Sequence, residues 1–334
     1  MGNVRFRLGA FLLVFAASAA FAGGDLLKWI PAGTEYVVGV DADSLRSLSC
    51  FRELTENGSE AGEVLAEFER NYNLRFSDCA DLLFVGGGSH LRGLLAQCKV
   101  PESELARRLR NFGSRFSLEG EAGRRLYCVR AENPGGGNPV TVGAAYLAPD
   151  VVFATERKYV APFFAALTVP AERRGSRIAG PAGEPLAWCS IDLKSILSRG
   201  RKKTPGDLGG ALFKGVNLIY AEWNTIGDGE FWRLDAIARC DDGKSAQRFA
   251  FAVPTWLQLG GSLLFSDDPV LGREFLKRVR VMPDGDRVIL ELEIPRPMAE
   301  RLIRYFGEQA KKRIIPPDPV PQDIRRPRLE GVRD

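Results

Sequence analysis

The residues EYVVGVDADSL, at positions 35–45, carry an apolar run that leads directly into a polar, helix-favouring segment. The run at 35–41 predicts a buried β-strand, because its valines favour strands and polar residues bound it. Asp41 or Asp43 can then accept hydrogen bonds from the free backbone N–H groups at the start of a helix. The stretch therefore predicts a strand that is followed at once by a helix.

A second stretch of the same kind, LAWCSIDLKSIL, lies at residues 186–197, and its Asp192 corresponds to Asp41 as a predicted cap. Two further landmarks recur in the same order: residues 93–99 resemble residues 235–241, and residues 152–156 resemble residues 264–268. The elements expected in each half run strand, helix, strand, strand, helix, strand. We therefore expect an α+β fold of two duplicated ferredoxin-like modules of βαββαβ type, with mainly antiparallel sheets and helices on one face.

The expected domain boundaries follow shifts in composition. A signal peptide covers residues 1–22, and a linker rich in Gly, Pro and Arg covers residues 171–185. The first module would occupy residues 23–170 and the second residues 186–310. The tail, residues 311–334, is rich in Pro and Arg and is expected to be disordered.

Within the second module, Pro254 predicts the end of a helix over about 244–253, because proline lacks the backbone donor that a helix interior needs. The apolar residues 261–265 are then expected to form a strand.

The N-terminus has the three parts of an export signal. Arg5 and Arg7 form a basic start, residues 8–20 are an apolar run, and AFA at residues 20–22 matches a small-residue cleavage site. No other segment of the sequence is long and apolar enough to span a membrane. We expect an exported protein, periplasmic or extracellular, that is soluble and does not span the membrane once the signal is removed.

The charge of the chain argues against a nucleic acid as its partner. The net charge is +4 at pH 7, from 46 basic and 42 acidic residues. The excess lies in the signal peptide and the tail, so the predicted folded part is close to neutral. A nucleic-acid surface would need a concentrated basic excess. The short basic stretch at residues 199–203 is interpreted as a solvated loop.

The sequence has six cysteines, and export would permit disulfides. The six are Cys50, Cys79, Cys98, Cys128, Cys189 and Cys240. The preferred pairs are Cys50–Cys79, Cys98–Cys128 and Cys189–Cys240, and the alternative is that the thiols are free and buried. No C-x-x-C motif occurs, so a zinc site or a thioredoxin-like site has no support.

Motifs for catalysis and cofactor binding are lacking. The single histidine, His90, would have to serve any Ser–His–Asp triad, and no G-x-S-x-G motif accompanies it. The glycines at 86–88 are followed by a predicted strand rather than a helix, so they indicate a turn and not a phosphate site. No catalytic residue, cofactor or metal is predicted.

Several other residues have simpler structural interpretations. Asp41 and Asp43 could form a metal or acid pair, but a helix-capping role explains them, and also Asp192, without any chemistry. Trp188, Trp223 and Trp232 lie within predicted strands and are expected in the core rather than at a sugar-binding surface.

The opening IPAGTEYVVGVD at residues 30–41, followed by Leu45 and by FREL at residues 51–54, resembles the opening of a group of uncharacterised exported bacterial α+β repeat proteins. An aliphatic strand and a GLLA strand follow in that group, as at residues 82–109 here. The resemblance implies an exported α+β repeat protein and no particular activity.

Together these features predict a non-catalytic protein that binds or scaffolds an unknown protein or envelope ligand. The alternative is an envelope hydrolase whose carboxylates come together only in the folded chain. A third possibility is a docking subunit whose Pro-rich tail binds a partner.

Overall fold

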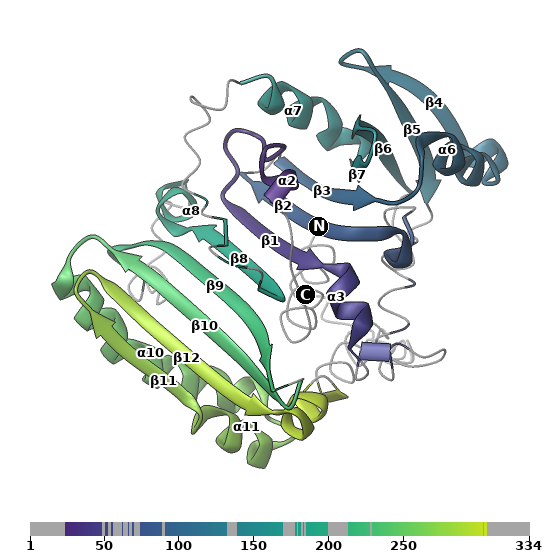
Figure 1. Cartoon of the computed structure of the whole chain (residues 1–334). Helices are drawn as coiled ribbons and strands as arrows, with labels where there is room; N and C mark the ends of the chain where they lie inside the picture. Colours follow the sequence, from purple (N-terminus) through teal and green to yellow (C-terminus); the bar gives the residue numbers. More distant parts are fainter. Residues whose placement is uncertain are drawn as a thin grey trace, which may run out of the picture.

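Strands β1 (Tyr36–Asp41) and β8 (Ala187–Asp192), which were expected to begin two separate modules, pair with each other in the computed structural model (Figure 1). The structure describes residues 24–48, 74–88, 91–131, 139–169, 185–199, 213–227 and 229–302, with residues 304 and 305 and some isolated residues in the gaps. The predicted signal peptide and the predicted tail therefore lie outside the described residues.

The β1–β8 pair divides the molecule into a first arm, residues 24–167, and a second arm, residues 187–302. The other elements of the first arm are α2 (Gly24–Leu27), α3 (Ala42–Ser47), the 3-10 turns η1 (Phe76–Asp78) and η2 (Gly113–Arg115), β2 (Cys79–Gly87), β3 (Leu91–Cys98), α6 (Glu102–Arg110), β4 (Phe116–Glu121), β5 (Arg124–Ala131), β6 (Val140–Ala148), β7 (Val151–Glu156) and α7 (Arg157–Leu167). Those of the second arm are α8 (Leu193–Arg199), β9 (Val216–Ile226), β10 (Phe231–Cys240), α10 (Gly243–Leu264), α11 (Pro269–Leu276), β11 (Val279–Asp284) and β12 (Arg287–Pro295).

The strands form one 12-stranded sheet in the order β11-β12-β10-β9-β8-β1-β2-β3-β7-β6-β5-β4, and every neighbouring pair is antiparallel. The α+β class is as predicted, but the two duplicated ferredoxin-like modules are wrong. A ferredoxin-like module alternates strands with crossover helices, whereas β1, β2 and β3 here follow one another as direct neighbours. The pairing of β1 with β8 then merges both arms into a single sheet.

The repeated landmarks agree with the sheet only in part. Residues 93–99 and 235–241 fall on β3 and β10, the third strand outward in each arm. Residues 152–156 form β7, but residues 264–268 lie where α10 ends, so the third landmark matches a strand with the end of a helix.

The junction of the arms requires a glycine. Gly39 lies opposite Trp188 in the β1–β8 ladder, and a Cβ built at Gly39 would be 2.1 Å from the indole Nε1 of Trp188. The indole therefore occupies the space that a side chain at position 39 would fill, and Trp188 is 2% exposed. Trp223 and Trp232 are buried as well and meet edge to face, so the core placement of all three tryptophans is confirmed.

Helices cover both faces of the first arm, so the prediction of helices on one face is wrong. On the first face, Leu82 and Leu94 pack with Leu45 of α3 and Leu105 of α6. On the second face, residues of the opposite parity, Leu83 and Leu95, pack with α2 and α7. A strand with an unbroken apolar run, such as LLFV in β2, has to be buried on both sides.

An aromatic stack fixes α7 on the second face. The rings of Phe153 in β7 and Phe163 in α7 stack with centroids 3.7 Å apart, and Phe164 meets Phe153 edge to face. Gly93 leaves room for this stack, because a Cβ there would be 2.5 Å from the Phe153 ring.

Helix α10 is longer than predicted. It continues through Pro254 to Leu264, and the strand expected at 261–265 does not form. Pro254 is exposed, while Phe249 and Ala250 pack beneath the first half of the helix and Phe265 packs into the main core after its end. Packing at both ends outweighs the lost backbone hydrogen bond, which costs about 3 kcal/mol in a helix interior.

Candidate functional site

Three carboxylates converge where β1 ends. Asp41 and Asp81 are direct partners across the β1–β2 ladder, and Asp43 follows two residues after Asp41 in α3. The sequence pattern identified Asp41 and Asp43 but not Asp81, which reads as the polar start of an apolar run. Only the strand register brings Asp81 opposite Asp41.

Each of the two predicted aspartates already has a structural partner. The Asp41 carboxylate accepts a hydrogen bond of 2.7 Å from the Ser44 backbone N–H and so caps α3. Asp43 does not cap the helix; it accepts hydrogen bonds of 2.6 Å from Lys99 Nζ and forms an ion pair with Arg46. Burial raises the pKa of the Asp43 carboxyl, but the contacts with Lys99 and Arg46 outweigh it and lower the pKa overall.

Asp81 is the carboxyl with unusual protonation. The Asp81 residue is only 7% exposed to solvent. Burial, and then the negative charges of Asp41 and Asp43, raise the pKa of Asp81 to about 7, against a smaller opposing effect of Lys99. A carboxyl with a pKa near neutrality can hold or release a proton at physiological pH, which is what a general acid or base requires.

Among the residues that the structure describes, no group of three or more His, Cys, Asp or Glu side chains could hold a metal ion. His90 lies outside the described residues, as do residues 200–203 of the predicted basic loop.

Asp192 caps α8 in the way that Asp41 caps α3. Its carboxylate accepts hydrogen bonds from the Ser195 backbone N–H, at 2.9 Å, and from Ser195 Oγ, at 2.8 Å. Asp192 is 5% exposed, so the cap is a buried one. The two caps give these aspartates a structural role at the start of α3 and of α8.

A buried glutamate that sequence reasoning missed ties the two arms together. Glu35 accepts a 2.7 Å hydrogen bond from the Gly88 backbone N–H and forms an ion pair with Arg199 at the end of α8. Gly88 has a φ of +56°, and a Cβ there would be 2.3 Å from the Arg199 guanidinium. Gly86 and Gly87 belong to β2, so only Gly88 lies in the predicted turn, where its N–H binds the Glu35 carboxylate and its lack of a Cβ leaves room for Arg199.

The second face of the second arm differs from the rest of the sheet, because no helix in the described part of the chain covers it (Figure 1). Helices α10 and α11 pack on the other face, over β10, β11 and β12. We call the uncovered surface of β9, β10, β12 and β11 the open face. It continues from the covered second face of the first arm across β1 and β8.

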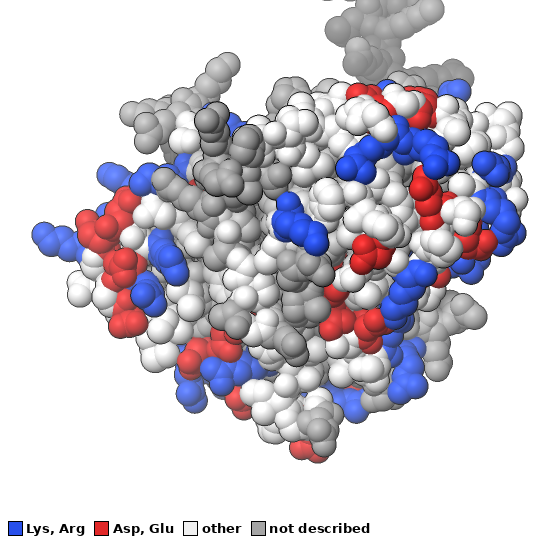
Figure 2. Space-filling model, turned by 45° about the horizontal axis from the view of Figure 1, so that its top comes forward, with Lys and Arg blue, Asp and Glu red and all other residues white. Residues whose placement is uncertain are grey.

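The open face has an apolar centre between charged side chains. Ile237 and Ile289 are cross-strand partners at its middle, and Arg233 Nε lies 2.7 Å from Asp235 on the same face. Charges of both signs lie across it: Arg233, Arg239, Arg280 and Arg287, with Glu222, Asp235, Asp284, Glu291 and Glu293. Basic and acidic side chains are also interspersed in the view of Figure 2, without one large basic patch.

The cysteines are not arranged as predicted. Cys98 packs on the first face of the sheet and Cys128 on the second, so the sheet itself separates this predicted pair. Cys189 and Cys240 lie two strands apart and about four residues out of register, roughly 16 Å by strand geometry, while a disulfide needs Cα atoms within about 7 Å. Cys50 lies outside the described residues, so the Cys50–Cys79 pair stays a prediction.

No family model, no curated protein and no solved structure matches this chain. In the part of the chain that the structure describes, none of the helices has both the length and the apolar character needed to cross a bilayer.

Proposed function

We propose that the chain is an exported, non-catalytic protein that binds a protein or another envelope ligand through the open face. The single observation behind this proposal is the uneven covering of the sheet. Both faces of the first arm are buried by helices, whereas the second arm has helices on only one face in the described residues.

The composition of the open face suits a protein partner. An apolar centre at Ile237 and Ile289, surrounded by charged groups of both signs, has the arrangement of a protein–protein interface with an apolar core and a polar rim. Charge of both signs gives no preference for a polyanion. The Arg233–Asp235 ion pair, at 2.7 Å, brings charges of opposite sign together on this face.

Site-specific photo-crosslinking in cells tests the proposal. A benzophenone amino acid would replace Ile289, at the centre of the open face, and in a matched control it would replace Leu118, which is 52% exposed on β4 at the far edge of the sheet. We expect a discrete crosslinked adduct from position 289 and none from position 118. Adducts at both positions, or at neither, would contradict binding through the open face.

Export is tested separately by fractionation and N-terminal sequencing. We expect the mature protein to begin at Gly23 in the envelope fraction. An uncleaved protein in the cytoplasm would contradict export while leaving the binding surface open to its own test.

A second candidate function is an envelope hydrolase that uses the carboxylate cluster. The observation in its favour is the Asp41–Asp81 pair, in which Asp81 can hold a proton near pH 7. Turnover of an ester, amide or glycoside by the purified chain, lost on Asp81→Asn with the fold intact, would favour this candidate over binding.

A further inference from the structure

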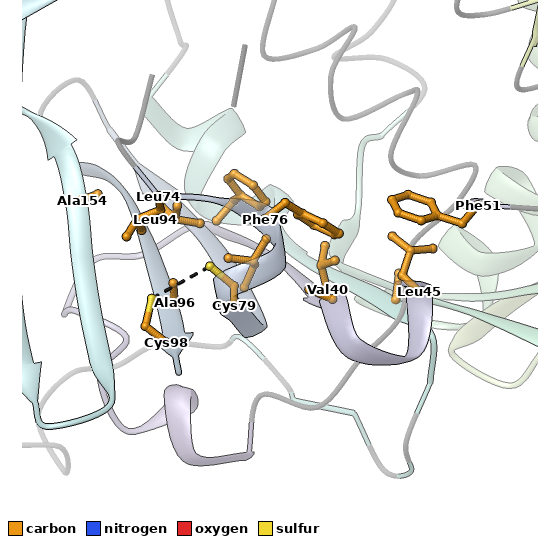
Figure 3. Close-up of a cluster of buried hydrophobic side chains, with 14 of the residues drawn as sticks. Val40, Leu45, Phe51, Leu74, Phe76, Cys79, Leu94, Ala96, Cys98 and Ala154 are labelled. Carbon is orange, nitrogen blue, oxygen red and sulfur yellow. Dashed lines mark hydrogen bonds between the residues drawn. The ribbon is translucent and has the colours of Figure 1, made fainter. Parts of the chain in front are cut away.

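Cys79 and Cys98 occupy a place in the sheet where a covalent link could form. Cys79 is the first residue of β2 and Cys98 the last of β3, and the two are direct partners in the β2–β3 ladder. Their sulfur atoms lie 3.9 Å apart, facing each other in the first-face core (Figure 3).

The backbone around the pair has the geometry that a disulfide needs. The Cys98 N–H donates to the Asp150 carbonyl on the side away from β2, and the Lys99 N–H donates to the Asp78 carbonyl. Cys79 and Cys98 are therefore a non-hydrogen-bonded pair, the kind whose Cα atoms come closest, at about 4.5 Å. That separation falls within the range found in disulfides, so a change of side-chain rotamer can bring the sulfur atoms together.

The pair is buried and packed mainly against apolar side chains, and the Cys79 thiol also donates to the Arg75 carbonyl at 3.4 Å. Cys79 is 0% and Cys98 5% exposed, and Phe76, Leu94 and Ala96 pack in the same cluster (Figure 3). The contact with Cys98, and then burial, raise the pKa of the Cys79 thiol well above its ordinary value. Because the thiolate is the attacking species, we expect the bond to form while β2 and β3 are still assembling, before burial raises the pKa of the thiol.

We propose that Cys79 and Cys98 are a modification site at which an intramolecular disulfide joins the start of β2 to the end of β3. The oxidant is a small-molecule disulfide such as oxidised glutathione. One cysteine thiolate attacks it, releasing one glutathione thiol and leaving a mixed disulfide. The second cysteine then attacks the mixed disulfide, which forms the Cys79–Cys98 bond and releases a second glutathione thiol. Overall, two cysteine thiols and one oxidised glutathione give one Cys79–Cys98 disulfide and two glutathione thiols, and no other reactant takes part.

The bond would hold the sheet at an irregular point. The β2–β3 register shifts between Cys79 and Asp81, and Lys99 next to Cys98 binds Asp43 in the carboxylate cluster. A link at this bulge would prevent β2 from slipping against β3, and slippage by one residue would move Asp81 to the other face.

The remaining described cysteines provide the control. Cys128 is equally buried but packs on the second face. A matched pair of variants is therefore Cys98→Ala, which removes one member of the proposed bond, and Cys128→Ala, which removes a thiol of similar burial elsewhere.

The test is refolding of the full chain from denaturant in a buffer of reduced and oxidised glutathione, followed by alkylation of free thiols and peptide mass spectrometry. We expect one crosslinked peptide pair containing Cys79 and Cys98, in the wild type and in Cys128→Ala but not in Cys98→Ala. Alkylation of Cys79 and Cys98 in the refolded wild type, or a bond from either to Cys50, would overturn the proposal. The wild-type map decides this even if a variant fails to fold, and it does not depend on export or on binding.

A thermal measurement on the same samples gives a second readout. The bond closes a loop between residues 19 positions apart, so oxidised protein should melt about 5 °C above reduced protein. The same shift is expected in Cys128→Ala and none in Cys98→Ala. Equal melting temperatures for oxidised and reduced wild type would contradict a stabilising bond.

Discussion

Replacing Asp81 by asparagine should stabilise the protein at neutral and alkaline pH but not in acid. Asp81 is 7% exposed and faces Asp41 across the ladder, and its pKa is raised from 3.8 to about 7 in the folded chain. The unfolded chain ionises this carboxyl above about pH 4, while the folded chain keeps it protonated until about pH 7. The unfolded state therefore binds fewer protons in that window, so wild-type stability falls as pH rises through it.

The size of the effect follows from the shift. A change from 3.8 to about 7 corresponds to about 4 kcal/mol of lost stability once the pH exceeds 7, as an upper limit set by full burial of the charge. Asparagine has nearly the same shape and no charge to bury. We expect Asp81→Asn to raise the free energy of unfolding at pH 8 by about 2 to 4 kcal/mol, and to change it by less than about 0.5 kcal/mol at pH 4.

The assay is urea denaturation followed by tryptophan fluorescence at several pH values, since Trp188, Trp223 and Trp232 are buried in the native state. The exposed Asp284→Asn is the matched control and should show no gain at either pH. A loss of stability in Asp81→Asn at pH 8, or a difference from wild type that is the same at pH 4 and pH 8, would refute the account of Asp81.

Two further substitutions test the junction and the caps. Gly39→Ala should lower the free energy of unfolding by about 3 kcal/mol, because its Cβ would overlap the Trp188 indole. The control Gly120→Ala, with nothing within 4 Å of the added Cβ, should change it by less than about 0.5 kcal/mol. Equal effects of the two substitutions would rule out the overlap. Asp192→Ala should lower the free energy of unfolding, measured by chemical denaturation, by about 1 to 2 kcal/mol, because the buried cap of α8 is lost. Asp192→Asn should retain most of the stability. If Asp192→Ala leaves the stability unchanged, the cap contributes little energy.

Local patterns predicted many elements correctly. The strand at 35–41 with the helix after it, and the second strand and helix at 186–197, form close to their expected positions. Apolar periodicity and turn residues act over a few positions, so they are readable in one sequence. Where a local signal competed with distant packing, as at Pro254 in α10, packing prevailed and the prediction was wrong.

The candidate sites likewise divide into residues that local sequence identifies and residues that only strand pairing brings together. Asp41 and Asp192 could be identified as helix caps from their position before a helix, and the structure places them there. The Asp81 carboxyl and the Cys79–Cys98 pair could not be identified, because each depends on which residue of a neighbouring strand lies opposite. Register is set by pairing between strands, and no spacing along the chain records it.

The amino-acid sequence alone determined the α+β class, the burial of the three strand tryptophans and most of the strands. The tertiary structure alone decided that β1 pairs with β8, that one sheet replaces two modules, and that the open face is left without a helix. Antiparallel pairing uses the backbone N–H and C=O groups that every residue type except proline carries, so the partner of an apolar strand is chosen by the packing of the whole chain.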